Sequence, residues 1–375
     1  MESIPSYVSR KKEEMEHLLY DLCRIPAPSH HEELRAEFCK KYLEQAGAEN
    51  VTIDRAKNVL YPLNCEGSKE ITVIMAHTDT VFPDTEPMPV HIENGRLYSP
   101  GAGDDTASLT CLLLAASYAA ENHLRPEKGI LFAANSCEEG LGNLLGIRTI
   151  VQDYAGRIAE VISFDSHFET IVNRAVGSVR YRIEAQTRGG HSFSDFGRRN
   201  AIEVLSSLIC DLYRQKLPTL GKTTFNVGTI TGGTSVNTIA QKAEMLYEYR
   251  SDEQESLEQM EDSLQSLLKQ HQSPDTKILV KKIGERPCMG KVDPDKLNSL
   301  LNRCSSILQE TVRQTPQTVS GSTDANIPLS LGVPALSMGV YEGAGAHTRE
   351  EYVVLSSLPV GLETAIKLVL SYCEM

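Results

Sequence analysis

The 375-residue sequence predicts an α/β protein with a mostly parallel sheet flanked by helices and a second, smaller domain inserted into it. Three observations predict this fold class. Apolar, strand-like runs alternate with helix-like segments early in the chain. The middle of the chain follows a β-α-β-β-α-β order instead. The last part is too short to bury a core of its own, so it must complete another domain.

The first part of the chain supplies the parallel sheet. Helical periodicity predicts three helices, at residues 10–24, 32–47 and 107–120. Nearly continuous β-branched and apolar runs predict three strands, at residues 70–76, 128–134 and 160–164. Strands of this kind that alternate with helices are typical of a parallel sheet covered on both faces.

The middle of the chain has a different pattern, because its first strand-like segment alternates polar and apolar side chains, as a half-exposed strand does. Strands and helices are expected in turn at residues 179–187, 198–214, 225–230, 243–250, 253–271 and 277–283. This order is the ferredoxin-like one. It fits one compact unit over residues 177–287.

The last part of the chain contains few elements. A helix is expected at residues 294–312, a short apolar strand at 335–338 and a closing helix at 357–373. Because so few elements cannot form a domain, we expect residues 288–375 to return to residues 1–176 and complete their fold.

The amino-acid composition excludes several classes of partner and site. The chain carries 37 Lys and Arg against 50 Asp and Glu, a net charge of −13, which argues against nucleic acid as a partner because phosphate binding needs clustered cations. Its nine cysteines are scattered without a Cys-x-x-Cys pair, so we expect neither a disulfide framework nor a cysteine zinc site. The polar N-terminus lacks the apolar segment of a signal peptide, and no run of 18 apolar residues occurs. We therefore expect a cytoplasmic protein without a membrane partner.

Ionisable side chains follow all three predicted parallel strands at the point where each strand ends. His77 and Asp79 follow the first strand, Glu138 and Glu139 the second, and Asp165 the third. The carboxyl ends of parallel strands meet at one edge of a sheet, where α/β proteins form their sites. One such motif alone is usually an ordinary turn or a solvated surface, whereas three at the same edge indicate a site.

Two glycine-rich segments add to this set. SPGAGDDTAS, residues 99–108, carries Asp104 in a tight loop that opens a helix, and GAGAHTREE, residues 343–351, carries His347. So many carboxylates cannot lie together uncompensated, because like charges force some of them to bind protons. A divalent cation removes this conflict, and His and carboxylate ligands without cysteine suit zinc, cobalt or manganese.

The order of these motifs resembles that of the M20 family of metallopeptidases, the peptidase-T-like and carboxypeptidase-G2-like di-zinc hydrolases. The matching segments cover nearly the whole chain: AHTDT, PGAGDDTAS, CEEGLGNLLG, the Phe-Asp pair at 164–165, GGHSFSDFGRRNAI, GGTSVNTIA, GSTDANIPLSLGVP and GAHTREE. The resemblance implies a di-zinc exopeptidase-type domain with an inserted lid domain that usually dimerises.

The resemblance also implies a role for each residue at the sheet edge. Two divalent metal ions are expected, zinc first, with cobalt or manganese as alternatives. Five ligands are implied: His77 and Asp165 for one ion, Glu139 and His347 for the other, and Asp104 as the bridge between them. Asp79 would orient His77 and raise its basicity. Glu138 would act as general base toward the attacking water and then as acid toward the leaving amine.

The implied substrate contacts lie further along the chain. His191 in GGHS would reach across a dimer to steady the oxyanion of the transition state. Asn237 and Arg250 would grip polar groups of the substrate, often a carboxylate, and Gly321 and Ser322 would line the substrate cleft.

The chain departs from the family's pattern at one position near the implied metals. Many members have Asp-Asp-Lys-Ala-Gly where this chain has Asp-Asp-Thr-Ala-Ser, so Thr106 stands in place of a cation. The departure leaves the ligand set intact and bears on substrate class and local charge balance.

The sequence thus predicts a metal-dependent amide hydrolase, an exopeptidase that cleaves small peptides as tripeptide aminopeptidases do and forms a homodimer through its lid. An N-acyl amino acid deacylase or desuccinylase is the alternative, because both reactions cleave an amide and need the same residues. A third reading is a non-catalytic binding protein with a relic metal site, against which the intact Glu138 argues.

Overall fold

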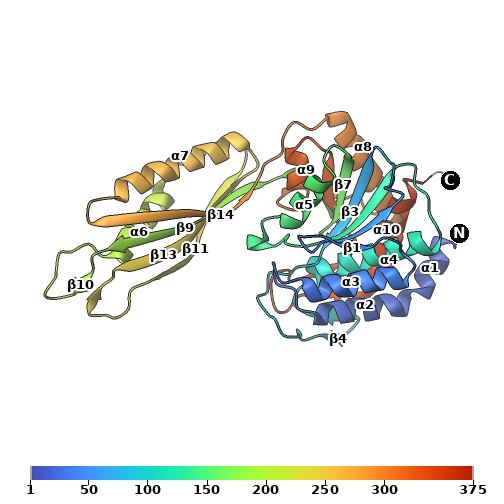
Figure 1. The fold of residues 1–375 in the computed structure, drawn as a ribbon, viewed down its shortest axis with the longest axis horizontal. Coiled ribbons are helices and arrows are strands. Elements are labelled where there is room, and N and C mark those ends of the chain that lie inside the picture. The colour runs from blue at the N-terminus through green and yellow to red at the C-terminus, as the bar shows by residue number, and fades with distance from the viewer. Residues whose placement is uncertain (1, 374–375) are drawn as a thin grey trace. The chain divides into compact units, whose positions relative to one another are not determined.

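The computed structural model describes residues 2–373, and the chain divides into two compact units. Unit 1 comprises Met1–Ala175 and Gly290–Met375, and unit 2 is the segment between them, Val176–Met289. The boundaries that the sequence predicts for the inserted segment are residues 177 and 287. Figure 1 shows the helices and strands of each unit.

Unit 1 is built on an eight-stranded sheet in the order β1-β2-β6-β3-β7-β16-β8-β15. The four central strands, β6, β3, β7 and β16, run parallel to one another, whereas β1, β2 and β8 introduce antiparallel pairs. The α/β class is therefore confirmed, with a mixed sheet whose parallel part is its centre. The strands are β1 (Thr52–Ile53), β2 (Val59–Leu63), β3 (Ile71–His77), β6 (Gly129–Asn135), β7 (Ile158–Phe164), β8 (Thr170–Ala175), β15 (Gln317–Gly321) and β16 (Ala335–Met338).

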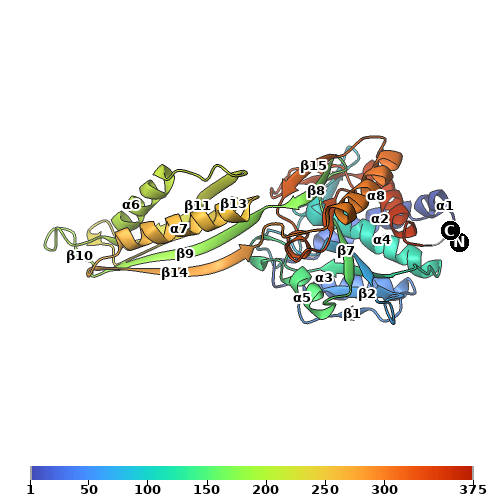
Figure 2. The ribbon, with the colours of Figure 1, turned by 90° about the horizontal axis from the view of Figure 1, so that it is seen from above.

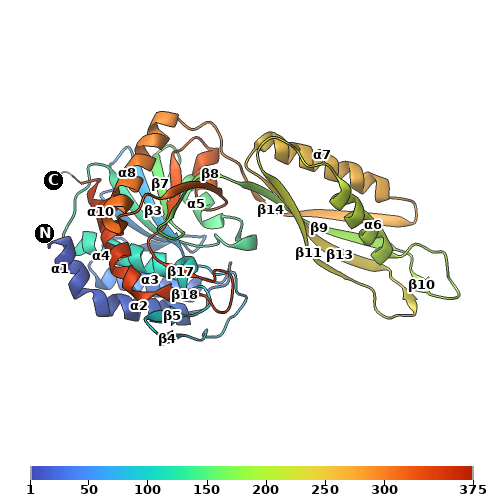
Figure 3. The ribbon, with the colours of Figure 1, turned by 180° about the vertical axis from the view of Figure 1, so that it is seen from behind.

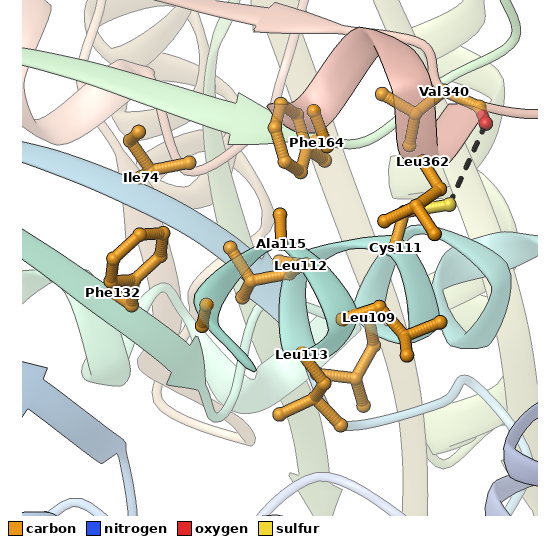
Figure 4. Packing of buried hydrophobic residues seen from close by; sticks show 14 of the residues in the cluster. Ile74, Leu109, Cys111, Leu112, Leu113, Ala115, Phe132, Phe164, Val340 and Leu362 are labelled. Atoms are coloured by element: carbon orange, nitrogen blue, oxygen red, sulfur yellow. Dashed lines mark hydrogen bonds between the residues drawn. The ribbon is translucent and has the colours of Figure 1, made fainter. Parts of the chain in front are cut away.

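Helices flank this sheet, and the most deeply buried of them is α4 (Ser108–Glu121). Its apolar side chains, among them Leu109 and Leu112, pack with Ile74 of β3 and Phe164 of β7 in one core (Figure 4). Helix α10 also packs on α4, and Leu362 lies in the same core. The other helices are α1 (Ile4–Arg10), α2 (Lys12–Arg24), α3 (Glu33–Gln45), α5 (Leu145–Asp153), α8 (Pro294–Val312), α9 (Asn326–Ser330) and α10 (Leu358–Leu370).

A small second sheet in unit 1 joins segments that are far apart in the sequence (Figure 3). Its order is β17-β18-β5-β4, with antiparallel pairing throughout, and Tyr352 of β18 lies opposite Tyr98 of β5. The strands are β4 (His91–Glu93), β5 (Arg96–Tyr98), β17 (Gly343–Ala344) and β18 (Tyr352–Val354). These strands are short, and the sequence pattern does not predict them.

Unit 2 has the element order β9-α6-β11-β13-α7-β14, and its antiparallel sheet has the order β11-β13-β9-β14. Helices α6 and α7 contact each other and pack on this sheet (Figure 2). The core between them includes Ile183, Leu205, Met245 and Leu264. The elements are β9 (Gly177–Thr187), α6 (Ala201–Arg214), β11 (Thr223–Gly232), β13 (Lys242–Ser251), α7 (Gln254–His271) and β14 (Thr276–Arg286).

Unit 2 also contains a short pair of strands outside its main sheet. In unit 2, the short strands β10 (Gly190–His191) and β12 (Thr238–Ile239) pair with each other and join two exposed loops. Within residues 2–373, none of the helices combines the length and the apolar character needed to cross a bilayer.

Candidate metal centre

The metal ligands that the sequence predicts in unit 1 meet at the carboxyl edge of the central parallel strands. His77 is the last residue of β3 and lies beside Asn135, the last residue of β6. Strand β7 flanks β3 on its other side and ends one residue before Asp165. The strand ends therefore deliver the imidazole and the carboxylates to one place, as the sequence predicts for parallel neighbours.

Asp104 lies between two imidazoles. Its Oδ1 is 3.0 Å from Nε2 of His77, and its Oδ2 is 3.0 Å from Nε2 of His347. The same His347 nitrogen is 3.3 Å from Oε1 of Glu139. A carboxylate with one oxygen directed at each imidazole has the arrangement that a bridging ligand needs.

The ligand atoms form two overlapping groups. In His77, Asp104 and Glu139, one candidate ligand atom of each residue lies within 4.8 Å of the other two, and the same holds for His77, Asp105 and Asp165. Asp105 is fully buried, and its Oδ2 accepts a hydrogen bond from the backbone N–H of His77, at 2.9 Å. The other oxygen of Asp105, Oδ1, is buried without a hydrogen-bond partner among the described residues. This orphaned oxygen fits a centre that holds cations.

Burial and mutual repulsion shift the pKa values at this edge. Burial, together with the charge of Asp104, raises the pKa of Asp165 well above its ordinary value. Burial raises the pKa of Glu139 to about 7. Hydrogen bonds to Asp104 and Glu139 raise the pKa of His347 to about 10. Bound divalent cations would favour the ionised form of these buried carboxyl groups and the neutral form of the imidazole, as metal ligation requires.

Asp79 contacts the backbone of the neighbouring Glu138-Glu139 loop as well as the proposed ligand His77. Its carboxylate accepts the backbone N–H groups of Glu138 and Glu139, both at 2.9 Å, and the hydroxyl of Ser29 at 2.6 Å. Nδ1 of His77 lies 3.0 Å from the backbone oxygen of Asp79 and 3.5 Å from its carboxylate. Either acceptor fixes the same tautomer, with Nδ1 protonated and Nε2 available as a ligand atom.

Glu138 is buried in the same loop, with its backbone fixed by Asp79. The preceding residue, Cys137, has a left-handed backbone with φ of 58°. Its thiol and its backbone N–H both donate to Oε1 of Glu32, at 3.1 Å each. Glu32 therefore anchors the turn that separates strand β6 from the Glu138-Glu139 pair.

A buried arginine holds two of the ligand-bearing segments. Arg35 of α3 donates to the backbone oxygen of Thr78, between His77 and Asp79, and lies 3.4 Å from the hydroxyl of Thr106. It also donates to backbone oxygens at the end of α2. A cation thus lies next to Thr106, where the sequence pattern indicates that one is lost. Sequence reasoning missed Arg35. The signal that could have found it is its place among the buried residues of α3, four residues before the buried Cys39.

The remaining predicted residues lie elsewhere. Gly321 ends β15 in unit 1 and Ser322 follows it. In unit 2, His191 and Asn237 are exposed in the two loops joined by β10 and β12, and the backbone N–H of Ser192 donates to the oxygen of Asn237. Arg250 of β13 is paired with Glu248, at 3.0 and 3.1 Å.

Comparison with known proteins identifies the family of this chain. Residues 73–371 match the peptidase family M20/M25/M40, which covers most of the chain. The chain therefore belongs to this peptidase family and is a hydrolase. An acetylornithine deacetylase from Myxococcus xanthus is 25% identical over 336 residues, which cover 85% of this chain and 83% of that protein.

Solved structures have the same fold. A tripeptidase from Staphylococcus aureus superposes with a TM-score of 0.73 at 19% identity, covering 96% of this chain and 97% of its own. The Bacillus subtilis YXEP protein, a dinuclear metal binding peptidase from the M20 family, superposes with a TM-score of 0.63 at 16% identity, covering 98% and 99%. These superpositions show that the chain shares its fold with these proteins.

Proposed function

We propose that this protein is a metal-dependent exopeptidase that cleaves small peptides, similar to tripeptide aminopeptidases. The observation that carries the proposal is the position of Asp104, with one carboxylate oxygen 3.0 Å from each of two imidazoles. Around it, His77 and Asp165 would hold one divalent ion and Glu139 and His347 the other. Zinc fits this donor set, with cobalt or manganese as alternatives.

The chain's own residues supply the proton chemistry. When bound, the metal ions would polarise the scissile carbonyl and make a water molecule easier to deprotonate. Glu138 takes a proton from the attacking water and delivers it to the leaving amine. Asp79 supports this role because it fixes the backbone of Glu138 and the tautomer of His77 together.

Unit 2 is proposed as the lid and dimerisation domain. His191 would steady the developing oxyanion, and its local geometry supports this role. Its Nδ1 accepts the N–H groups of Phe193 and Ser194, both at 3.3 Å, so that in the neutral ring the proton lies on Nε2. A protonated Nε2 is the donor that an oxyanion needs. Asn237, Arg250, Gly321 and Ser322 are proposed to contact the substrate.

An edge strand supports dimerisation through unit 2. Strand β11 forms one edge of the sheet and contains no charged residue over ten positions, TTFNVGTITG. The other edge, β14, carries five: Lys277, Lys281, Lys282, Glu285 and Arg286. Charged side chains protect an edge from pairing with another chain, so β11 is the edge suited to pair with a second copy.

The cytoplasmic location that the sequence predicts remains part of this proposal.

A second candidate substrate class is favoured by one observation. The relative from Myxococcus xanthus, which matches over 85% of this chain, is an acetylornithine deacetylase. An N-acyl amino acid presents the same amide bond as a peptide, and the same carboxylates and imidazoles would serve both reactions. The chain would then be a deacylase or desuccinylase.

One experiment tests the proposal and separates the two classes. Di- and tripeptides are compared with N-acetyl and N-succinyl amino acids, and the metal content of the same enzyme sample is measured. Turnover of peptides at a metal content near two per chain is the expected result. Turnover of N-acyl amino acids alone would replace the first function with the second. A metal-loaded protein that hydrolyses neither class would refute both.

A further inference from the structure

The loop that carries Asp104 is anchored by a buried carboxylate that belongs to neither metal group. Glu351 is 1% exposed, and its two oxygens accept three backbone N–H groups of this loop. Oε2 accepts from Gly101 at 2.7 Å, and Oε1 accepts from Gly103 at 3.0 Å and from Asp104 at 2.8 Å. A carboxylate that receives several backbone N–H groups makes strong, charge-assisted hydrogen bonds.

The small second sheet brings Glu351 to this loop. Glu351 comes directly before β18, and the loop comes directly after β5, which is the antiparallel partner of β18. Pairing of Tyr352 with Tyr98 continues into a hydrogen bond from the N–H of Ser99 to the oxygen of Glu351. The side chain of Glu351 therefore extends over residues 101–104, although about 250 residues separate them in the sequence.

The loop is shaped to admit this carboxylate. A Cβ atom on Gly103 would lie 2.9 Å from Oε1 of Glu351 and 2.8 Å from the hydroxyl of Tyr341, so only glycine lets the two side chains approach. Gly101 has a φ of 73°, in the left-handed region that favours glycine. The glycines of the motif thus have a specific use, which is to expose three N–H groups to one carboxylate.

Glu351 also belongs to the segment that carries the second imidazole. It follows His347 by four residues, and both lie between β17 and β18. The hydrogen bonds of Glu351 consequently tie the loop of Asp104 to the segment of His347, independently of any ion between the two side chains. They add to the link that the β5–β18 pairing already makes between these two segments.

We infer that Glu351 is a positioning residue of the metal centre, which holds Asp104 in the bridging orientation between His77 and His347. The inference rests on the proposed metal centre and adds to it a residue that touches no metal. Glu351 acts through the backbone of residues 101–104, so its loss is expected to weaken metal binding without removing a ligand.

The test is a metal titration of Glu351→Gln, with Glu350→Gln as the matched control. The glutamine amide can accept from Gly103 and Asp104 but presents a donor to the N–H of Gly101. The neighbouring Glu350 is exposed and has none of these contacts. Apo protein is titrated with Zn²⁺ against a chelating indicator, without substrate, and thermal unfolding of the apo forms is measured in parallel.

We expect the Zn²⁺ affinity of Glu351→Gln to fall about 10- to 100-fold, the range for residues that support metal ligands, and that of Glu350→Gln to stay unchanged. Turnover of Glu351→Gln should recover when Zn²⁺ is raised, because no catalytic group is lost. An affinity within about twofold of the wild type would overturn the inference, since metal binding would not depend on the supporting carboxylate. A wild type that binds no metal would instead refute the metal centre itself.

A second variant keeps the inference testable if Glu351→Gln does not fold. Gly103→Ala retains the carboxylate but places a methyl group against Oε1 of Glu351. It should also lower the Zn²⁺ affinity. Folded Gly103→Ala protein with wild-type affinity would overturn the inference.

Discussion

The predicted site residues of the two units lie in opposite environments. In unit 1, His77 is 1% exposed and Asp79 is fully buried, and hydrogen bonds from several segments fix both residues. In unit 2, His191 and Asn237 lie in exposed loops, where Phe193 is 87% and Val236 102% exposed. His77 and Asp79 have the fixed geometry that metal binding requires, whereas His191 and Asn237 lie at the surface, in loops joined by one short strand pair. This difference fits the proposal that unit 1 performs the chemistry and that the loops of unit 2 act by contacting something outside that unit.

Metal removal should have the largest effect, because it removes the function of all five ligands at once. Dialysis against a chelator is expected to abolish turnover, and addition of Zn²⁺, Co²⁺ or Mn²⁺ should restore it. The measurement is the hydrolysis rate together with the metal content of each sample. Full activity in metal-free protein would break the comparison, because the buried edge would then have no catalytic use.

Replacement of Glu138 should have the next largest effect. Glu138→Gln keeps the shape of the side chain but cannot accept a proton, so kcat should fall about 10²- to 10⁴-fold. Metal content should remain that of the wild type, because the five proposed ligands are intact. Glu86→Gln, at an exposed position, serves as the control. A Gln variant with normal kcat would exclude Glu138 as the base.

His191 tests whether the exposed loops of unit 2 serve a neighbouring chain. His191→Ala should lower kcat about 10²- to 10³-fold, as loss of an oxyanion donor does. Mixing this variant with inactive Glu138→Gln and allowing subunits to exchange should restore about one quarter of wild-type turnover if each site borrows His191 from its partner in a symmetric dimer. No recovery in verified mixed dimers would place His191 in its own chain's site.

The two edge strands of unit 2 allow a smaller, matched test. Ile230 of β11 and Val280 of β14 are 48% and 39% exposed, and each lies opposite a buried residue of the neighbouring strand. Ile230→Lys should weaken the dimer because a charge on a pairing edge opposes strand addition, while Val280→Lys should not. Sedimentation at several concentrations measures the association. Equal behaviour of the two variants would mean that β11 is not the interface.

Much of the fold follows from the sequence pattern because the pattern records burial. Strands β3 and β6 are buried at every position and β7 over its second half, so their apolar runs are visible without a structure. The expected helix at residues 10–24 is α2, whereas helix α1 before it and strands β8 and β15 are not predicted. These strands lie at the end of the sheet, where partial exposure weakens the apolar signal.

The sequence by itself determined which groups could carry the chemistry, since the ends of parallel strands must lie at one sheet edge. It therefore placed His77, Glu139 and Asp165 together. Only the tertiary structure decided how they are supported. Arg35 reaches Thr78 and Thr106 from a helix, and Glu351 reaches the Asp104 loop across about 250 residues. Such contacts depend on strand pairing and packing between distant segments, which no local pattern records.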